Sequence, residues 1–167
     1  MIKIRRATEH DIDSIRDIAI KTWAIAYKEI LSEEQRTYML EMMYSVSALR
    51  NQMTNGHQFF IAEYAGISAG FLSCETEYDG RNALKIHKYY VLPTLQGKGI
   101  GSVLLEEAEK LAVSSKSAFI TLNVNRFNLT IQHYLSKGFV ITKSEDISIG
   151  NGYLMEDFVM EKKIAYI

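Results

Sequence analysis

The sequence has few of the residues that mark special classes of protein. It contains one proline, Pro93, one cysteine, Cys74, and four histidines, no two of which are spaced i, i+4 as on one face of a helix. A single cysteine excludes an internal disulfide and is typical of a reducing compartment. Without an activating neighbour in the sequence, Cys74 is expected to be a packed thiol on a strand. The histidine spacing predicts no metal site.

The sequence also lacks an excess of charge of one sign and any long apolar run. Nineteen basic and 20 acidic residues give a net charge of −1, which supplies no basic field for nucleic acid. No apolar run approaches the ~20 residues that cross a bilayer. The first residues, MIKIRRATEHD, carry charges where a signal peptide needs an apolar segment. We therefore expect a cytoplasmic protein with neither nucleic acid nor membrane as partner.

Helical and strand-like segments alternate along the 167 residues without a linker or repeat, which predicts a single domain, 1–167. Helices are expected at about 9–30, from Ser32 as N-cap to Tyr44, and at 46–53, 97–114 and 127–137. Strands are expected at 2–8, 58–64, 67–78, 82–93, 117–124, 139–149 and 153–164. This order is that of an α/β fold in which the strands on either side of the helix 97–114 form a parallel pair.

The stretch YYVLPTLQGKGIGSVLLEEAEKL, residues 89–111, joins a strand to a helix through a glycine-rich turn. Unpaired N–H groups and the dipole at a helix N-terminus favour a phosphate, and glycines let the backbone approach it. A Walker loop would need a glycine at Val91 or Leu92 before the Gly97-Lys98 pair. A Rossmann fingerprint would need a third glycine where Ser102 stands. Both nucleotide patterns are therefore excluded.

Two motifs instead resemble those of the GCN5-related N-acetyltransferase (GNAT) superfamily. Gln96-x-x-Gly99-x-Gly101, after a strand ending in Val-x-Pro, resembles its acetyl-CoA-binding signature. The segment NVNRFNLTIQHYLSKGF, residues 123–139, resembles its downstream motif, with Tyr134 before a Gly-Phe pair. The resemblance implies a mixed, mostly antiparallel sheet with helices on both faces. Its central parallel β-α-β pair would be splayed at a bulge.

The resemblance also implies how acetyl-CoA is held. The backbone of the strand before the turn would bind the acetyl carbonyl and the pantetheine arm. The turn would hold the pyrophosphate, and an asparagine would contact the cofactor arm. The asparagine is assigned to Asn128, although the family spacing lies between Asn125 and Asn128. The predicted cofactor-binding residues are Tyr89, Tyr90, Val91, Gln96, Gly97, Lys98, Gly99, Ile100, Gly101, Ser102 and Asn128.

Two residues are expected to carry the chemistry. Tyr134 stands where the family has its general acid, and a phenol of pKa about 10 can protonate a thiolate leaving group. An alkyl ammonium of pKa about 10.4 must also lose a proton before it attacks. His87 is the candidate base, at a position where relatives resembling polyamine (spermidine/spermine) acetyltransferases carry a glutamate. The alternatives without a catalytic role are that Tyr134 only packs on the sheet and that His87 only packs on a strand face or is exposed to solvent.

The predicted function is therefore transfer of acetyl to a primary amine by direct attack in a ternary complex. A small cationic or polyamine-like acceptor is preferred to a protein. The alternatives are an acetyltransferase of protein N-termini or lysines, and a non-catalytic acyl-CoA sensor or interaction domain. Late in the strand 117–124 the sequence reads Thr121-Leu122-Asn123, without the glutamate that family members acetylating ribosomal-protein N-termini carry there. Trp23, Tyr27, Tyr38, Met42 and Tyr44 are candidates for the acceptor pocket, and Glu75, Glu77, Asp79, Glu156 and Asp157 for attracting an amine. A homodimer is in keeping with the family.

Overall fold

The computed structural model describes residues 1–166, in which seven strands form one sheet. Their order is β1-β2-β3-β4-β5-β7-β6, and β4 with β5 is the parallel pair. The other neighbours pair antiparallel, which confirms the expected mixed sheet. The strands are β1 (Ile2–Arg6), β2 (Gln58–Tyr64), β3 (Ile67–Glu75), β4 (Ala83–Val91), β5 (Phe119–Asn125), β6 (Val140–Ser148) and β7 (Leu154–Lys163).

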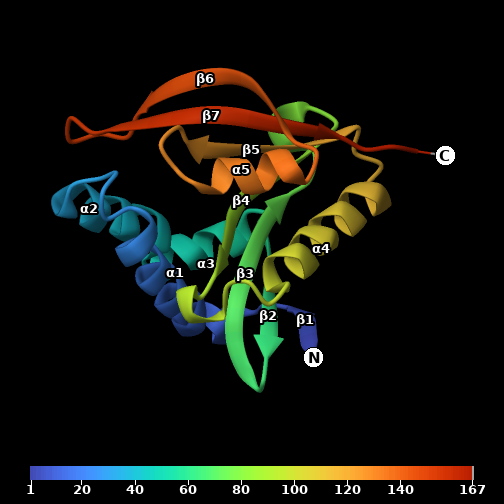
Figure 1. Cartoon of the computed structure of the whole chain (residues 1–167), viewed down its shortest axis with the longest axis horizontal. Helices are drawn as coiled ribbons and strands as arrows, with labels where there is room; N and C mark the ends of the chain where they lie inside the picture. The colour runs from blue at the N-terminus through green and yellow to red at the C-terminus, as the bar shows by residue number, and fades with distance from the viewer. Residues whose placement is uncertain (167) are drawn as a thin grey trace.

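Helices cover both faces of the sheet (Figure 1). One face carries α1 (Ile12–Ala26), α2 (Glu33–Tyr44) and α3 (Val46–Thr54), and the other carries α4 (Ile100–Ser114) and α5 (Thr130–Ser136). The Ser32 hydroxyl accepts from the Gln35 N–H at 3.1 Å, so the predicted N-cap is confirmed. The first helix is shorter than expected, because a 3-10 turn occupies Glu9–Asp11 and α1 ends at Ala26. Two further 3-10 turns lie at Tyr78–Gly80 and Pro93–Leu95.

Two apolar cores lie on the two faces of the sheet. Ile15, Trp23 and Phe71 belong to the core beneath α1–α3. Leu72, Leu104 and further buried residues form the core beneath α4 and α5. Phe71 and Leu72 are neighbours on β3 and face opposite sides, as the alternation of side chains along a strand requires. Within the described residues, no helix is both long and apolar enough to cross a membrane.

The parallel pair separates halfway along β4. Residues Ala83–Ile86 pair with Phe119–Leu122, and the two strands then diverge. On the other side of β4, the register with β3 shifts between Ser73 and Cys74, so that His87 is the extra residue of a bulge. A bulge increases the local twist of a strand. In Figure 1, β3 and β4 accordingly run across the direction of β5–β7. The backbone edge of β4 from Lys88 to Val91 therefore lies unpaired on the side that faces β5.

Candidate active site

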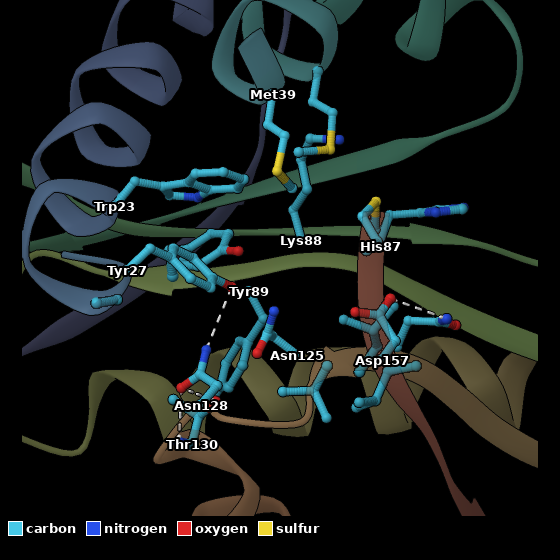
Figure 2. A pocket seen from close by; sticks show the side chains of 18 of the residues that line it. Trp23, Tyr27, Met39, His87, Lys88, Tyr89, Asn125, Asn128, Thr130 and Asp157 are labelled. Atoms are coloured by element: carbon cyan, nitrogen blue, oxygen red, sulfur yellow. Dashed lines mark hydrogen bonds between the residues drawn. The ribbon is translucent and has the colours of Figure 1, made fainter. Parts of the chain in front are cut away.

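A cleft with a volume of about 410 Å³ opens where β4 and β5 diverge. Figure 2 shows Trp23 of α1, Tyr27 just after α1 and Met39 of α2 on one side, and Asn125, Asn128 and Asp157 on the other. Side chains of β4 lie between them. Of the predicted site residues, the cleft is lined by His87, Tyr89, Tyr90, Gln96, Asn128 and Tyr134. The glycine turn lies beyond the end of β4, next to Gln96.

The glycine turn has the backbone that its composition predicts. Gly97 and Gly99 have φ of +81° and +83°, in the left-handed region that glycine adopts readily. A Cβ on either glycine would meet no protein atom within 4 Å, so the space above the turn is open. Gly99 precedes the first residue of α4, and the Val103 N–H donates to its carbonyl at 3.2 Å. The N–H groups of the first three residues of α4 remain without helical partners, as an anion site requires.

The turn is tied to its surroundings by side chains at three places. The Gln96 amide donates to the Val91 carbonyl at 3.3 Å, and the Tyr89 hydroxyl donates to the Gly101 carbonyl at 2.6 Å. A Cβ at Gly101 would lie 2.7 Å from that hydroxyl, so a larger residue would have to displace the Tyr89 hydroxyl from this contact. The third tie is Lys137 Nζ, which donates to Ser102 Oγ at 2.9 Å. Lys137 thus adds a positive charge at the start of α4.

Tyr134 projects from α5 into the buried end of the cleft. It is 7% exposed, and its ring packs against those of Phe139 and Tyr89 at centroid distances of 5.7 Å and 5.9 Å. Burial, with the neighbouring Tyr89 and Tyr27, raises the pKa of Tyr134 above its usual value. The phenol therefore stays protonated throughout the neutral pH range. A protonated donor is the form that a departing thiolate needs.

Both candidate asparagines line the cleft. The Asn128 carbonyl accepts from the backbone N–H and the hydroxyl of Thr130, both at 2.9 Å. Its amide donates to the Tyr27 hydroxyl at 3.3 Å. Asn125 accepts from the Phe127 N–H at 2.9 Å. Asn128 thus fixes the first turn of α5, and its contact with the cofactor stays a prediction.

His87 lies at the bulge, in contact with a carboxylate and a second imidazole. Its Nε2 is 2.9 Å from Glu75 Oε1, and its ring stacks on that of His57 with centroids 4.1 Å apart. Burial, followed by the positive charges of His57, Lys88 and Lys85, lowers the pKa of His87 to about 3. The ring is neutral at pH 7, so Nε2 carries the proton that it donates to Glu75. A proton acceptor of such low pKa is weak, and the role of His87 as base stays a prediction.

His57 and His87 both contact the Glu75 carboxylate, which the spacing of the histidines in the sequence did not indicate. Atoms of His57, Glu75 and His87 that could bind a metal lie within 4.8 Å of one another. Lys88 acts on both imidazoles to lower their pKa values, and Lys85 does so on His87. These positive charges oppose a cation at the same place. We therefore continue to predict no metal here.

The acceptor side of the cleft is only partly as predicted. Trp23, Tyr27 and Tyr44 line it, together with Met39 and Met43. Met42, in contrast, is 40% exposed, and the Tyr38 hydroxyl donates to the Ile149 carbonyl at 2.6 Å. Among the acids expected to attract an amine, Asp157 lines the cleft, and so does Glu145, which the sequence did not suggest. Glu75 contacts the two histidines instead.

A family comparison agrees with this geometry. The model of the acetyltransferase (GNAT) domain family matches residues 26–162. The chain belongs to the GNAT family. As in other members, an acetyltransferase fold is built here around a diverging parallel strand pair, and the GNAT motifs recognised in the sequence fall at the ends of those two strands.

Two comparisons with known proteins each match this GNAT chain to an N-acetyltransferase of Thermoplasma acidophilum. A relative named spermidine N(1)-acetyltransferase is 26% identical over 168 residues, 97% of each chain. Among solved structures, the chain is similar to the PaiA N-acetyltransferase in complex with coenzyme A, with a TM-score of 0.82 and 28% identity over 98% of this chain and 99% of that one. The Escherichia coli ribosomal-protein-S18-alanine N-acetyltransferase shares the fold, with a TM-score of 0.75 and 18% identity over 100% of this chain and 96% of that one.

The structure places carboxylates next to Asn123 of β5. Asn123 lies in the part of the strand where family resemblance indicates a glutamate in enzymes that acetylate ribosomal-protein N-termini. In the structure, the Asn123 amide donates to Asp157 Oδ2 at 3.3 Å and to Glu145 Oε2 at 3.1 Å. Acidic groups are thus present at this part of the cleft, but β6 and β7 supply them.

Proposed function

We propose that this GNAT acetyltransferase transfers the acetyl group of acetyl-CoA to a primary amine of a small cationic molecule. The observation that carries the proposal is the unpaired edge of β4 between the glycine turn and Tyr134. A pantetheine arm can bind along this edge as an added strand would, because its amides match free backbone groups. The pyrophosphate would then lie at the N-terminus of α4, and the thioester beside Tyr134.

The chemistry follows from this placement. A backbone N–H of β4, from Tyr89 to Val91, would polarise the acetyl carbonyl and stabilise the oxyanion. The amine would attack the thioester carbon directly from the acceptor side of the cleft. Tyr134 would give its proton to the sulfur as the C–S bond breaks. The amine must lose a proton as well, and His87 is the group that the sequence suggested for this step.

The proposed acceptor class rests on the acceptor side of the cleft. The rings of Trp23 and Tyr27 lie at a centroid distance of 4.7 Å there, across the cleft from the carboxylate of Asp157. Aromatic faces and carboxylates both attract ammonium groups. The relative named spermidine N(1)-acetyltransferase supports a polyamine as the first acceptor to test.

Release of free thiol from acetyl-CoA should be measured with spermidine, spermine, 1,4-diaminobutane, lysine amide and a peptide with a free N-terminus. We expect turnover with the polyamines and the diamine, and at least tenfold lower kcat/KM with the peptide. Preference for the peptide would contradict the acceptor class. Binding of acetyl-CoA without thiol release for any amine would indicate a non-catalytic acyl-CoA-binding protein.

Substitution of a turn glycine should weaken cofactor binding specifically. In Gly99→Ala, the residue keeps φ near +83° only under strain of about 1 kcal/mol, and its methyl group enters the space proposed for the pyrophosphate. We expect the Kd for acetyl-CoA, measured by calorimetry, to rise at least tenfold. Gly152→Ala is the matched control, because Gly152 also has positive φ, +77°, and open space around it. Equal effects of the two substitutions would contradict the phosphate site.

A further inference from the structure

Asp157 is a buried carboxylate on the acceptor side of the cleft. It lies on β7 directly opposite Asn125 of β5, and it is 3% exposed. Figure 2 shows its carboxylate on the wall that faces Lys88 and the helices carrying Trp23 and Met39. The antiparallel pairing of β7 with β5 therefore places an acid beside the point where β5 leaves β4.

The carboxylate of Asp157 is only partly satisfied by the protein. Its Oδ2 accepts from the Asn123 amide at 3.3 Å, and among the described residues Asn123 is the side chain that hydrogen-bonds to it. Since the residue lines the cleft, its second oxygen is available to a ligand there. A buried charged group without a full set of partners is costly, and such groups mark functional sites.

Three charged groups act on Asp157, and they come from β4, β6 and the segment after β5. Lys85 of β4, Arg126 after β5 and Glu145 of β6 all act on the pKa of Asp157, and Asp157 in turn acts on that of Tyr27, just after α1. Burial is the largest influence and raises the pKa of Asp157 above its ordinary value near 4. Lys85 and Arg126 oppose this rise, whereas Glu145 adds to it. The Asp157 carboxylate therefore has a greater tendency to accept a proton than a carboxylate in water.

His87 is less suited to the same task. Its pKa of about 3 reflects a buried ring surrounded by positive groups, and these groups repel an ammonium. Its Nε2 proton is directed to Glu75. Asp157 attracts an ammonium instead, and one of its oxygens is free on the acceptor side.

We propose that Asp157 is the general base that deprotonates the acceptor's ammonium; this rests on the proposed function. The ammonium gives one proton to Asp157, and the freed lone pair attacks the thioester carbon. As the C–N bond forms and the C–S bond breaks, Tyr134 gives its proton to the sulfur. The second proton lost from nitrogen replaces the one that Tyr134 gave up. Asp157 releases its proton to solvent, so the products are the amide, free coenzyme A thiol and one proton.

The pH dependence of Asp157→Asn tests this role. The wild type uses the ammonium form, so its kcat/KM should change little between the pKa of Asp157 and that of the amine. The variant can use only amine that is already neutral in solution. Below the pKa of the amine, this neutral fraction rises tenfold per pH unit. We expect a loss of about 10²-fold at pH 7 that shrinks about tenfold for each unit of pH. The ratio of variant to wild type is the readout, because titration of other groups affects both proteins.

Glu145→Gln and His87→Gln complete the comparison, each with spermidine and with the panel amine of highest turnover. Glu145 is the matched control, because it also accepts from Asn123 but pairs with Lys143 at 2.8 Å. The ratio of kcat/KM for Glu145→Gln to that for the wild type should not vary with pH. A ratio for Asp157→Asn that is constant with pH would overturn the proposal, as would a pH-dependent ratio for His87→Gln alone.

Two further measurements separate loss of the base from loss of folding or of donor binding. Circular dichroism and the Kd for acetyl-CoA should show that Asp157→Asn is folded and binds the donor. If it is not folded, Asp157→Glu should retain the flat wild-type profile at a reduced rate, and a profile rising with pH would contradict the proposal. Absence of wild-type turnover with every amine would refute the proposed function itself, whereas an active wild type with a constant ratio refutes only the assignment of Asp157.

Discussion

Tyr134→Phe is expected to lower kcat about 10²–10³-fold, or about 3–4 kcal/mol in activation free energy, with little change in the Kd for acetyl-CoA. The substitution removes the proposed proton donor but keeps the ring that packs on Phe139 and Tyr89. Thiol release at saturating donor and acceptor measures the loss. Calorimetry with acetyl-CoA shows whether donor binding is retained.

The pH profile gives this prediction a second test. Because burial raises the pKa of Tyr134, the wild-type phenol stays protonated from pH 6 to 9, and the loss in Tyr134→Phe should be the same across that range. Tyr166→Phe is the matched control. It likewise removes one tyrosine hydroxyl, which donates to the Ser117 carbonyl at 2.6 Å, and Tyr166 does not line the cleft. Full activity of Tyr134→Phe would remove Tyr134 from the mechanism.

Local sequence signals were sufficient for the framework and for the cofactor side of the site. Strand alternation and helix caps such as Ser32 depend on neighbours in the sequence, so the elements fall near their predicted positions, although ends such as that of α1 differ. The glycine turn is likewise local, since Gly97 and Gly99 need positive φ whatever packs around them. Family resemblance added the splay between β4 and β5, which the pairing of only Ala83–Ile86 with Phe119–Leu122 confirms.

The acceptor side depends on contacts between residues far apart in sequence. Asp157 meets Asn123 only because β7 returns beside β5, and Lys137 reaches Ser102 only because α5 packs near the start of α4. The pKa values of the site residues likewise depend on tertiary contacts. A lone histidine in a sequence suggests a pKa near 6.5, whereas burial among positive groups lowers that of His87 to about 3. The sequence could therefore identify His87 as a candidate base but could not predict its pKa.

Lys88→Met is expected to stabilise the fold by about 3 kcal/mol at pH 7. Lys88 is 7% exposed, its ammonium lies 5.1 Å from the centre of the Tyr44 ring, and no carboxylate of the described residues lies within 4.0 Å of it. Burial lowers the pKa of Lys88 from 10.5 to about 8, a difference worth about 3 kcal/mol at roughly 1.4 kcal/mol per pH unit. Methionine has a similar length and no charge to desolvate.

The pH dependence has a definite sign. Between pH 8 and 10.5 the unfolded lysine holds a proton that the folded one has lost, so wild-type stability rises with pH in this window. The advantage of Lys88→Met, measured by urea unfolding, should therefore fall by roughly half between pH 7 and pH 9.5. Lys110→Met is the control, because the Lys110 side chain is 73% exposed and its removal should change stability by less than about 0.5 kcal/mol. A destabilised Lys88→Met would show that the ammonium is well paired in the folded protein. A stabilised variant with impaired turnover would instead show that this buried charge is retained for catalysis or acceptor binding at the expense of stability.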